Sequence, residues 1–345
     1  MAVKDGDSDL RALVPKGAAY QPVDNPGPTR TYAFVLVPGF TLLAFSSAVE
    51  PLRIANQLSQ KPLYRWDLMS TDGKPAISSS GIEVSVGGPL ATQDKEVPLF
   101  VCAGNPATAA TDPSVVAAVQ RHYRFGGTVG GICTGAVALA KAGLLGGRRF
   151  TLHWENQPGF CETFPDLVPT PSRYESDTRL MTCGGGAAAT EMMLSVIAAD
   201  HGAVFAAMVS DMCLRPAMIG TDPEQRSSTS AMMNLRSPRV IAAINLMRAN
   251  VDLPLAASDI AESVGCSRRQ LERLFTTHLN QTPGAFYRSI RLDRARNLLA
   301  TTDLSVTEVF TACGFDSTSH FARAFKARFG VVPTKLRQQT NQTAH

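Results

Sequence analysis

The stretches DIAESVGCSRRQLERLF (259–275) and EVFTACGFDSTSHFARAFK (308–326) repeat one pattern near the C-terminal end of the chain. In each copy a short helix with apolar periodicity ends at a glycine, Gly265 or Gly314, and a polar turn leads into a second helix that carries arginine. Glycine suits such a turn because it adopts a left-handed conformation at little energetic cost. This arrangement is the helix-turn-helix plan, and two units on one chain predict two recognition helices in successive major grooves.

The spacing of the two copies changes inside the turn. The glycines lie 49 positions apart, whereas Leu271 and Phe321 lie 50 apart. One extra residue is therefore predicted in the second turn. The apolar side chains that recur at helical spacing are predicted to form the core rather than a contact surface. They are Leu271, Leu274, Phe275, Phe321 and Phe325.

Charge separates a DNA-binding tail from the alternative, an ordinary helical bundle. Residues 236–345 contain 15 Lys+Arg and 8 Asp+Glu, a balance of +7. Residues 1–235 contain 18 and 21, a balance of −3. Basic surfaces supply the sequence-independent part of DNA affinity because they displace counterions from the phosphates. The charge distribution therefore favours a tail that binds double-stranded DNA.

Residues 238–337 resemble the AraC-type DNA-binding domain, in which a long helix joins two helix-turn-helix units. The resemblance rests on GCSRRQLERLF, TPGAFYRSIRLDRARNLL and GFDSTSHFARAFKARFGVVPTKLR. It implies that the second helix of each unit reads base edges, where arginine pairs with guanine and glutamate accepts from cytosine. The implied reading residues are Arg269, Glu272 and Arg273 in the first unit and Thr318, Ser319 and Arg323 in the second. Phosphate contacts are expected from Arg268, His320, Lys326 and Arg328.

Length and composition predict two folded domains and a reducing compartment. The chain has 345 residues, of which 44% are hydrophobic. No apolar run reaches the ~18 residues of a membrane span, and no secretory signal opens the chain. Seven cysteines without a CxxC pair argue against zinc. We therefore expect a cytoplasmic protein without a membrane partner, metal or cofactor. Its expected parts are a disordered tail (1–29), a first domain (30–215), a linker (216–237) and a second domain (238–340).

The first domain alternates strands and helices. TYAFVLV (31–37), LFVCAG (99–104) and TVGGIC (128–133) are apolar throughout, and each precedes a predicted helix. Further predicted strands are YRWDLMST, RFTLHW and RLMTCGG, with a hairpin over 76–86 and a long helix from Ala187 to about His201. Apolar strands that alternate with helices indicate a parallel sheet covered on both faces. The predicted fold class is an α/β three-layer sandwich, followed by an all-α double helix-turn-helix domain.

The segment GICTG (131–135) fits the turn at which α/β enzymes hold a nucleophile between strand and helix. The flanking glycines permit the sharp bend, and Cys133 would lie near a helix N-terminus. Backbone amides and the helix dipole at that position are expected to lower the pKa of a thiol. An inert buried thiol remains the alternative.

The first domain also resembles the PfpI-like branch of the class I glutamine amidotransferase fold, which is flavodoxin-like. The matching stretches are FVLVPGF, LFVCAG, GICTGAVALAKAGLLGGRRFTLHW and the helix after TCGGG. The resemblance implies that Cys133 occupies the nucleophile position and that His153 is the remaining candidate base. Thr134 stands where several hydrolases of the family carry histidine, and Ala44 stands where relatives carry an acid. These departures favour a ligand pocket without catalytic residues over an active hydrolase.

Ligands of open α/β sheets bind at the carboxyl ends of the strands. The residues expected there are Phe40, Cys133, Thr134, His153 and Trp154. Aromatic faces suit a cationic head group, and a helix N-terminus suits a carboxylate. The stretches AFSSAVEPLRIANQL and YRWDLMSTDGKP resemble the subgroup of these regulators that senses glycine betaine, carnitine or arginine.

The predicted function is a ligand-responsive transcriptional activator. Its expected partners are double-stranded DNA, a small effector such as glycine betaine, carnitine or arginine, RNA polymerase and a second copy of the chain. One alternative is a cysteine-dependent amidase or hydrolase of the PfpI type fused to a DNA-binding domain. Another is an architectural DNA-binding protein whose first domain only dimerises it.

Overall fold

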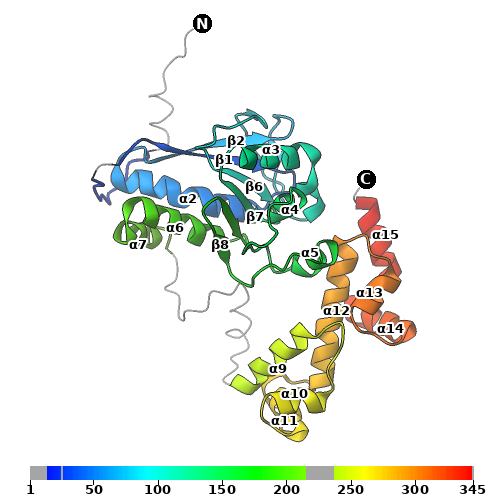
Figure 1. Cartoon of the computed structure of the whole chain (residues 1–345). Coiled ribbons are helices and arrows are strands. Elements are labelled where there is room, and N and C mark those ends of the chain that lie inside the picture. The colour runs from blue at the N-terminus through cyan, green and yellow to red at the C-terminus, as the bar shows by residue number, and fades with distance from the viewer. Residues whose placement is uncertain (1–13, 25, 215–236, 344–345) are drawn as a thin grey trace. The chain divides into compact units, whose positions relative to one another are not determined.

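The computed structural model describes residues 14–24, 26–214 and 237–343 (Figure 1). The chain divides into two compact units, residues 1–225 and 226–345. The predicted linker, 216–237, lies outside the described residues except for Ser237. No helix within the described part of the chain has the length and apolar character that a membrane span requires.

A mainly parallel sheet forms the centre of the first unit, in the order β5-β2-β1-β6-β7-β9-β8. Its strands are β1 (Arg30–Leu36), β2 (Tyr64–Ser70), β5 (Gly88–Pro89), β6 (Leu99–Ala103), β7 (Val129–Cys133), β8 (Tyr174–Ser176) and β9 (Leu180–Cys183). All pairs are parallel except β8 with β9. Because every strand of this sheet except β8 runs the same way, the carboxyl ends of those strands meet at one edge.

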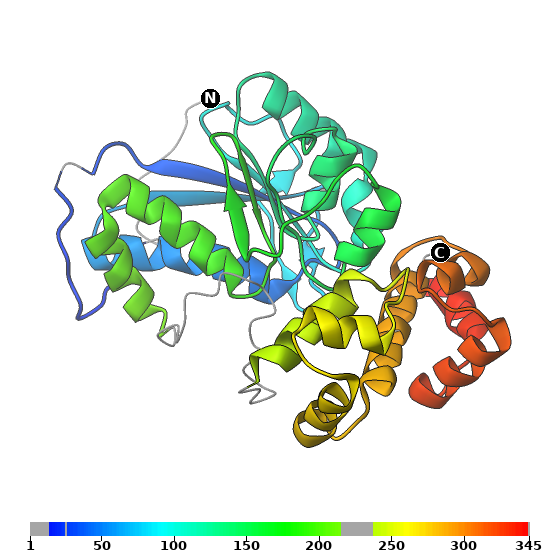
Figure 2. The same cartoon turned by 60° about the horizontal axis from the view of Figure 1, so that its bottom comes forward.

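Helices cover both faces of this sheet, as predicted (Figures 1 and 2). One face packs against α2 (Leu42–Ser59), α6 (Ala188–His201) and α7 (Ala203–Met212). The other packs against η1 (Ala107–Thr111), α3 (Pro113–Arg124), α4 (Ala136–Lys141) and α5 (Gln157–Thr163). Alternation along β1 produces the two cores, because Phe34 and Leu36 join the first and Ala33 and Val35 join the second.

The structure confirms the predicted hairpin and corrects one strand. β3 (Ala76–Ile77) and β4 (Glu83–Val84) pair antiparallel within 76–86. The predicted strand RFTLHW (149–154) is irregular instead. Both edges of β9 are already paired, so the backbone N–H of Thr151 donates to the Thr182 hydroxyl at 2.9 Å rather than joining the sheet. The helix predicted to follow the strand 128–133 is present but short, since α4 has six residues.

The described part of the predicted N-terminal tail has defined contacts with α2. Residues 14–24 follow an irregular path without helix or strand. The N–H of Gln21 donates to the Leu58 carbonyl at 2.8 Å, and Val23 is buried in the α2 core. Residues 1–13 and 25 lie outside the described residues.

Seven helices make up the described part of the second unit. They are α9 (Pro238–Ala249), α10 (Ala257–Ser263), α11 (Arg268–Leu279), α12 (Pro283–Thr301), α13 (Val306–Ala312), α14 (Thr318–Phe329) and α15 (Pro333–Thr343). The first three helices and the start of α12 enclose one apolar core. The rest of α12 encloses a second core with α13 and α14. This helix therefore connects two helix-turn-helix units, as the repeat predicts.

The inserted residue falls in the second turn. The first helices of the two helix-turn-helix units begin 49 residues apart, at Ala257 and Val306. Their second helices begin 50 apart, at Arg268 and Thr318. Gly265 has φ +67° and Gly314 has φ +63°, so both turns use the expected left-handed conformation.

Candidate functional site: an elbow after strand β7 and two exposed helices

The end of β7 is a strained elbow. Cys133 has φ +61°, a value that few residues with a Cβ adopt. The positions on either side of Cys133 require glycine, because neighbouring backbone atoms lie too close to leave room for a Cβ. A Cβ on Gly131 would lie 2.5 Å from the Ala136 nitrogen, and one on Gly135 would lie 2.0 Å from the Val101 oxygen. The predicted strand-to-helix turn is therefore present.

Loops that follow three other strands come together at the elbow. Thr41, which follows β1, donates from its hydroxyl to the Cys133 sulfur at 3.7 Å. Gly185, which follows β9, lies so close that an added Cβ would be 2.7 Å from the Cys133 Cβ. Gly104, which follows β6, packs against the loop after β1. These contacts leave the thiol 6% exposed.

Burial makes the Cys133 thiol harder to ionise, whereas a nucleophilic thiol is expected to ionise easily. The pKa of Cys133 is raised because burial disfavours the thiolate, although the Thr41 hydroxyl and the Thr134 amide act in the other direction. The Glu155 carboxylate adds to the rise. The expectation that the turn lowers the pKa was therefore wrong, because desolvation outweighs the local hydrogen bonds.

Besides Cys133, two more of the five predicted ligand residues lie beneath the surface. Phe40 is fully buried and packs edge-on against Phe45, with ring centroids 5.8 Å apart. Thr134 is also fully buried, and its hydroxyl donates to the Gly104 carbonyl at 2.7 Å. Neither side chain is therefore accessible to a ligand at the surface.

The remaining two predicted residues, His153 and Trp154, reach solvent in the loop 153–155. His153 lies beside the Trp154 ring, with centroids 5.5 Å apart, and its Nδ1 is 3.9 Å from a Glu155 oxygen. Partial burial lowers the pKa of His153, so the imidazole is neutral at pH 7. Trp154 is 40% exposed, and the Glu155 side chain is 49% exposed. An aromatic face and a carboxylate are therefore accessible in this loop, and the carboxylate is close enough to Cys133 to raise the pKa of its thiol.

Sequence reasoning missed Thr41 and Glu155. Both are polar residues in loops, and their proximity to Cys133 depends on which strands lie side by side. Thr41 does follow an apolar strand, and this position could have marked it. Glu155 directly follows RFTLHW, which was predicted to be a strand, so the same position could have marked it, although that segment is irregular in the structure.

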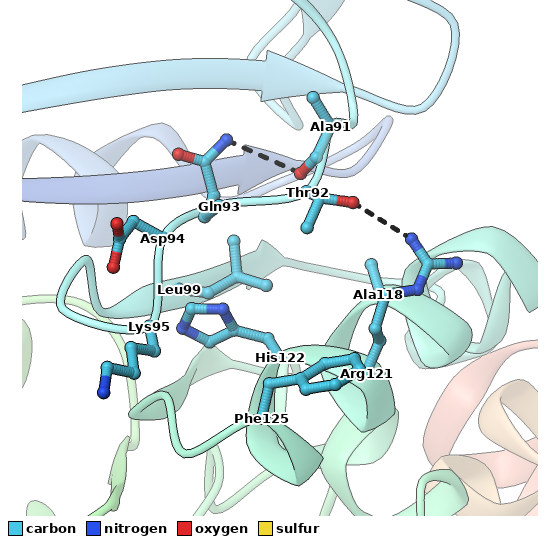
Figure 3. Close-up of a pocket in the computed structure, with 10 residues that line it drawn as sticks. All are labelled: Ala91, Thr92, Gln93, Asp94, Lys95, Leu99, Ala118, Arg121, His122 and Phe125. Atoms are coloured by element: carbon cyan, nitrogen blue, oxygen red, sulfur yellow. Dashed lines mark hydrogen bonds between the residues drawn. The ribbon is translucent and has the colours of Figure 1, made fainter.

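A cavity of about 400 Å³ lies at the opposite edge of the sheet (Figure 3). It lies between residues 91–95, which precede β6, and the end of α3, and Asp94 and Arg121 stand on opposite walls. Arg121 donates to the Thr92 hydroxyl at 3.2 Å. None of the predicted ligand residues lines this cavity.

The predicted DNA-contacting side chains are all exposed in the second unit. In α11 they are Arg268, Arg269, Glu272 and Arg273, and in α14 they are Thr318, Ser319, His320, Arg323 and Lys326. The predicted core residues Leu271, Phe275, Phe321 and Phe325 are buried, and Leu274 is partly buried. Arg268 pairs with Glu272 at 3.1 Å, and Arg328 pairs with Asp293 at 2.8 Å. Both helices therefore present a polar face and bury an apolar one.

Comparison with known proteins agrees with this two-part architecture. The helix-turn-helix domain model matches residues 260–339, and the DJ-1/PfpI family model matches residues 33–199. The HTH-type transcriptional regulator CdhR of Pseudomonas aeruginosa is 41% identical over 90% of this chain and 92% of its own length. The chain belongs to the AraC-type regulators with a DJ-1/PfpI domain.

Other members of the family match over similar lengths. The HTH-type transcriptional regulator GlxA of Rhizobium meliloti is 39% identical, over 89% of this chain and 95% of its own. The HTH-type transcriptional regulator GbdR of Pseudomonas aeruginosa is 36% identical, over 92% and 86%. This AraC-type regulator is accordingly a DNA-binding transcription factor and not an enzyme. Ala44, which the resemblance to the PfpI-like fold places where relatives carry an acid, lies in the apolar core.

Proposed function

We propose that this regulator responds to a small molecule with a cationic head group, either a quaternary amine or an amino acid, bound at the β7 elbow. The observation that carries the proposal is that the neighbouring Trp154 and Glu155 are both accessible and that the Glu155 carboxylate acts on the Cys133 thiol. An indole face attracts a cation through its quadrupole, and a carboxylate supplies the opposite charge. Glycine betaine, carnitine and arginine all have such a head group.

The thiol contributes shape rather than reactivity in this proposal. Cys133 is buried and its pKa is raised, so it stays protonated at pH 7. The effector would act by binding one arrangement of the two units more tightly than another, because only differential affinity shifts an equilibrium. Cys133→Ser is therefore expected to retain most of the ligand response, and complete loss of response in a folded variant would favour covalent chemistry.

A charge-matched ligand pair tests the proposal on the full-length protein. Choline and its uncharged isostere 3,3-dimethylbutanol have nearly the same shape, and thermal shift and calorimetry would be run on both, then on glycine betaine, carnitine and arginine. A ligand that binds only the folded state raises the melting temperature. We expect stabilisation by at least one cationic compound and none by the isostere.

Variants then locate the site. Trp154→Ala and Glu155→Gln should each weaken binding, and Trp154→Phe should retain part of it because a ring remains. Arg121→Gln, in the cavity at the opposite edge, is the matched control and should bind normally. Binding that survives both elbow variants but is lost in Arg121→Gln would refute the placement at the elbow.

The remaining parts of the proposal follow from the resemblance of the two units to known regulators. We propose a cytoplasmic homodimer that binds paired half-sites beside a promoter and activates RNA polymerase. Light scattering should give the mass of a dimer. Transcription with purified polymerase should rise when the effector is added, and a fall would mean repression instead.

A further inference from the structure

A second cavity lies inside the DNA-binding unit, between the connecting helix and the second recognition helix. It measures about 360 Å³ and is lined by residues of α12, of the turn before α14, and of α14 itself. Its nitrogen-bearing side chains are Arg288 and Arg291 from α12 and His320 and Arg323 from α14. Asp316 is the acidic residue among those that line it. The cavity is therefore built to hold negative charge.

Arg291 forms a fixed wall of this cavity. Its Nε donates to the Cys313 carbonyl at 2.8 Å, and its Nη2 donates to the Gly314 carbonyl. The guanidinium also lies over the Phe315 ring, 4.1 Å from the centroid. These contacts fix α12 to the turn of the second helix-turn-helix unit, between α13 and α14. Arg291 therefore holds the shape of the cavity and is already hydrogen-bonded.

Arg288 and Arg323 supply positive charge that no ion pair within the described residues neutralises. Both side chains are exposed, and neither makes a hydrogen bond or ion pair with a residue in the described ranges. Arg288 lies three residues before Arg291 and therefore on the same face of α12. Arg323 enters the cavity from α14. Two helices thus direct unpaired guanidinium groups into one space.

The start of α14 adds backbone donors to the same space. Ser317 is the N-cap, and its hydroxyl accepts from the His320 N–H at 3.4 Å. The other N–H groups of the first turn lack partners within the helix, and the dipole of this 12-residue helix favours an anion there. Ser317 and His320 line the cavity.

We propose that this cavity binds one phosphodiester of the DNA backbone and that Arg288 of the connecting helix contacts that phosphate. The inference rests on DNA binding by the second unit. A backbone phosphate, rather than a free anion, is indicated by position. The cavity is open to solvent at the start of α14, where the exposed Thr318 and Ser319 are expected to meet base edges. The groups beside a reading helix contact the phosphates that flank the groove.

The salt dependence of DNA binding tests this assignment. The slope of log K against log salt changes by about 0.9 for each phosphate that the protein no longer neutralises. Full-length Arg288→Gln would be compared with wild type by fluorescence anisotropy on a mixed-sequence duplex, because a phosphate contact acts on any sequence. We expect the slope to become less negative by about 0.9, and we expect the affinity to fall several-fold. Arg288→Lys should restore the slope, since charge alone determines it.

Arg296→Gln is the matched control. Arg296 is an exposed arginine of the same helix that packs near the Phe329 ring, 5.3 Å from the centroid, and it does not line the cavity. Both variants should keep the wild-type melting temperature. An unchanged slope in Arg288→Gln, or an equal drop in both variants, would overturn the proposal.

Two further outcomes separate the sources of failure. If the wild type binds no duplex at all, the DNA-binding function fails rather than the assignment of Arg288. If inorganic phosphate stabilises the wild type relative to chloride at equal ionic strength, while Arg288→Gln keeps the DNA slope, the cavity holds a free anion and the proposal is wrong.

Discussion

Replacing Gly314 by alanine should damage the DNA-binding unit far more than the same change at Gly265. Both glycines have a left-handed backbone, with φ +63° and φ +67°. They differ in their surroundings. A Cβ on Gly314 would lie 2.6 Å from the Asp252 carbonyl oxygen and 2.7 Å from a Pro254 carbon. Around Gly265 nothing lies within 4 Å of the same atom.

The magnitudes follow from these two differences. The left-handed conformation costs a non-glycine residue about 1–2 kcal/mol, and both variants carry this cost. Gly314→Ala must also displace backbone in a packed region, which adds about 1–3 kcal/mol. We therefore expect Gly265→Ala to lower the free energy of unfolding by about 1–2 kcal/mol. The expected decrease for Gly314→Ala is about 2–5 kcal/mol.

Hydrogen exchange of the full-length protein measures this by region. Amides of α13 and α14 exchange when the DNA-binding unit opens. Each decrease of 1.4 kcal/mol in the free energy of opening speeds that exchange about tenfold. Peptides from α14 should exchange at least several times faster in Gly314→Ala than in Gly265→Ala, while peptides from the sheet of the first unit stay unchanged. Equal exchange of α14 in the two variants would refute the reasoning, because it would mean that contact with Asp252 and Pro254 costs nothing.

Three other predictions concern the elbow and the first reading helix. Thr134→Val should lower the unfolding free energy by about 1–3 kcal/mol in urea titrations, because the Gly104 carbonyl is then left without its buried donor, and Thr134→Ser should have a smaller effect. Cys133 has a raised pKa when folded, so its stabilising effect is complete below the unfolded thiol pKa of about 8.5 and is lost as pH rises above it. Unfolding free energy measured from pH 7 to 10 should therefore fall less steeply in Cys133→Ala. Arg273→Ala should weaken specific DNA binding by about 1–3 kcal/mol and relax one base position, and an unchanged footprint would contradict the assignment of the first reading helix.

Most of the fold could be predicted from the sequence, because the patterns that indicate its strands, helices and turns are local. Apolar strands such as 99–104 and the glycine turns can be recognised over a few residues. The misassigned strand at 149–154 shows the limit of this approach. Its apolar residues were recognised correctly, since Phe150 and Leu152 are buried. Whether such a segment joins a sheet depends on whether an edge is free, and β8 occupies that edge of β9.

The candidate site was accessible only in part. The pattern GICTG predicts the elbow and the position of Cys133. It does not predict the state of the thiol, which depends on Thr41 and Gly185 from loops far away in the chain. Phe40 and Thr134 lie near the elbow as expected, but their side chains face inward.

The chain's residues, read in order, already determine a basic tail with a doubled helix-turn-helix unit and a body of alternating strands and helices. These properties come from charge, periodicity and the conformational freedom of glycine, which act over short distances along the chain. The tertiary structure alone decides that the elbow thiol is buried with a raised pKa and that Arg288 and Arg323 line one cavity. Desolvation and charge clustering depend on which distant segments become neighbours, and only folding brings those segments together.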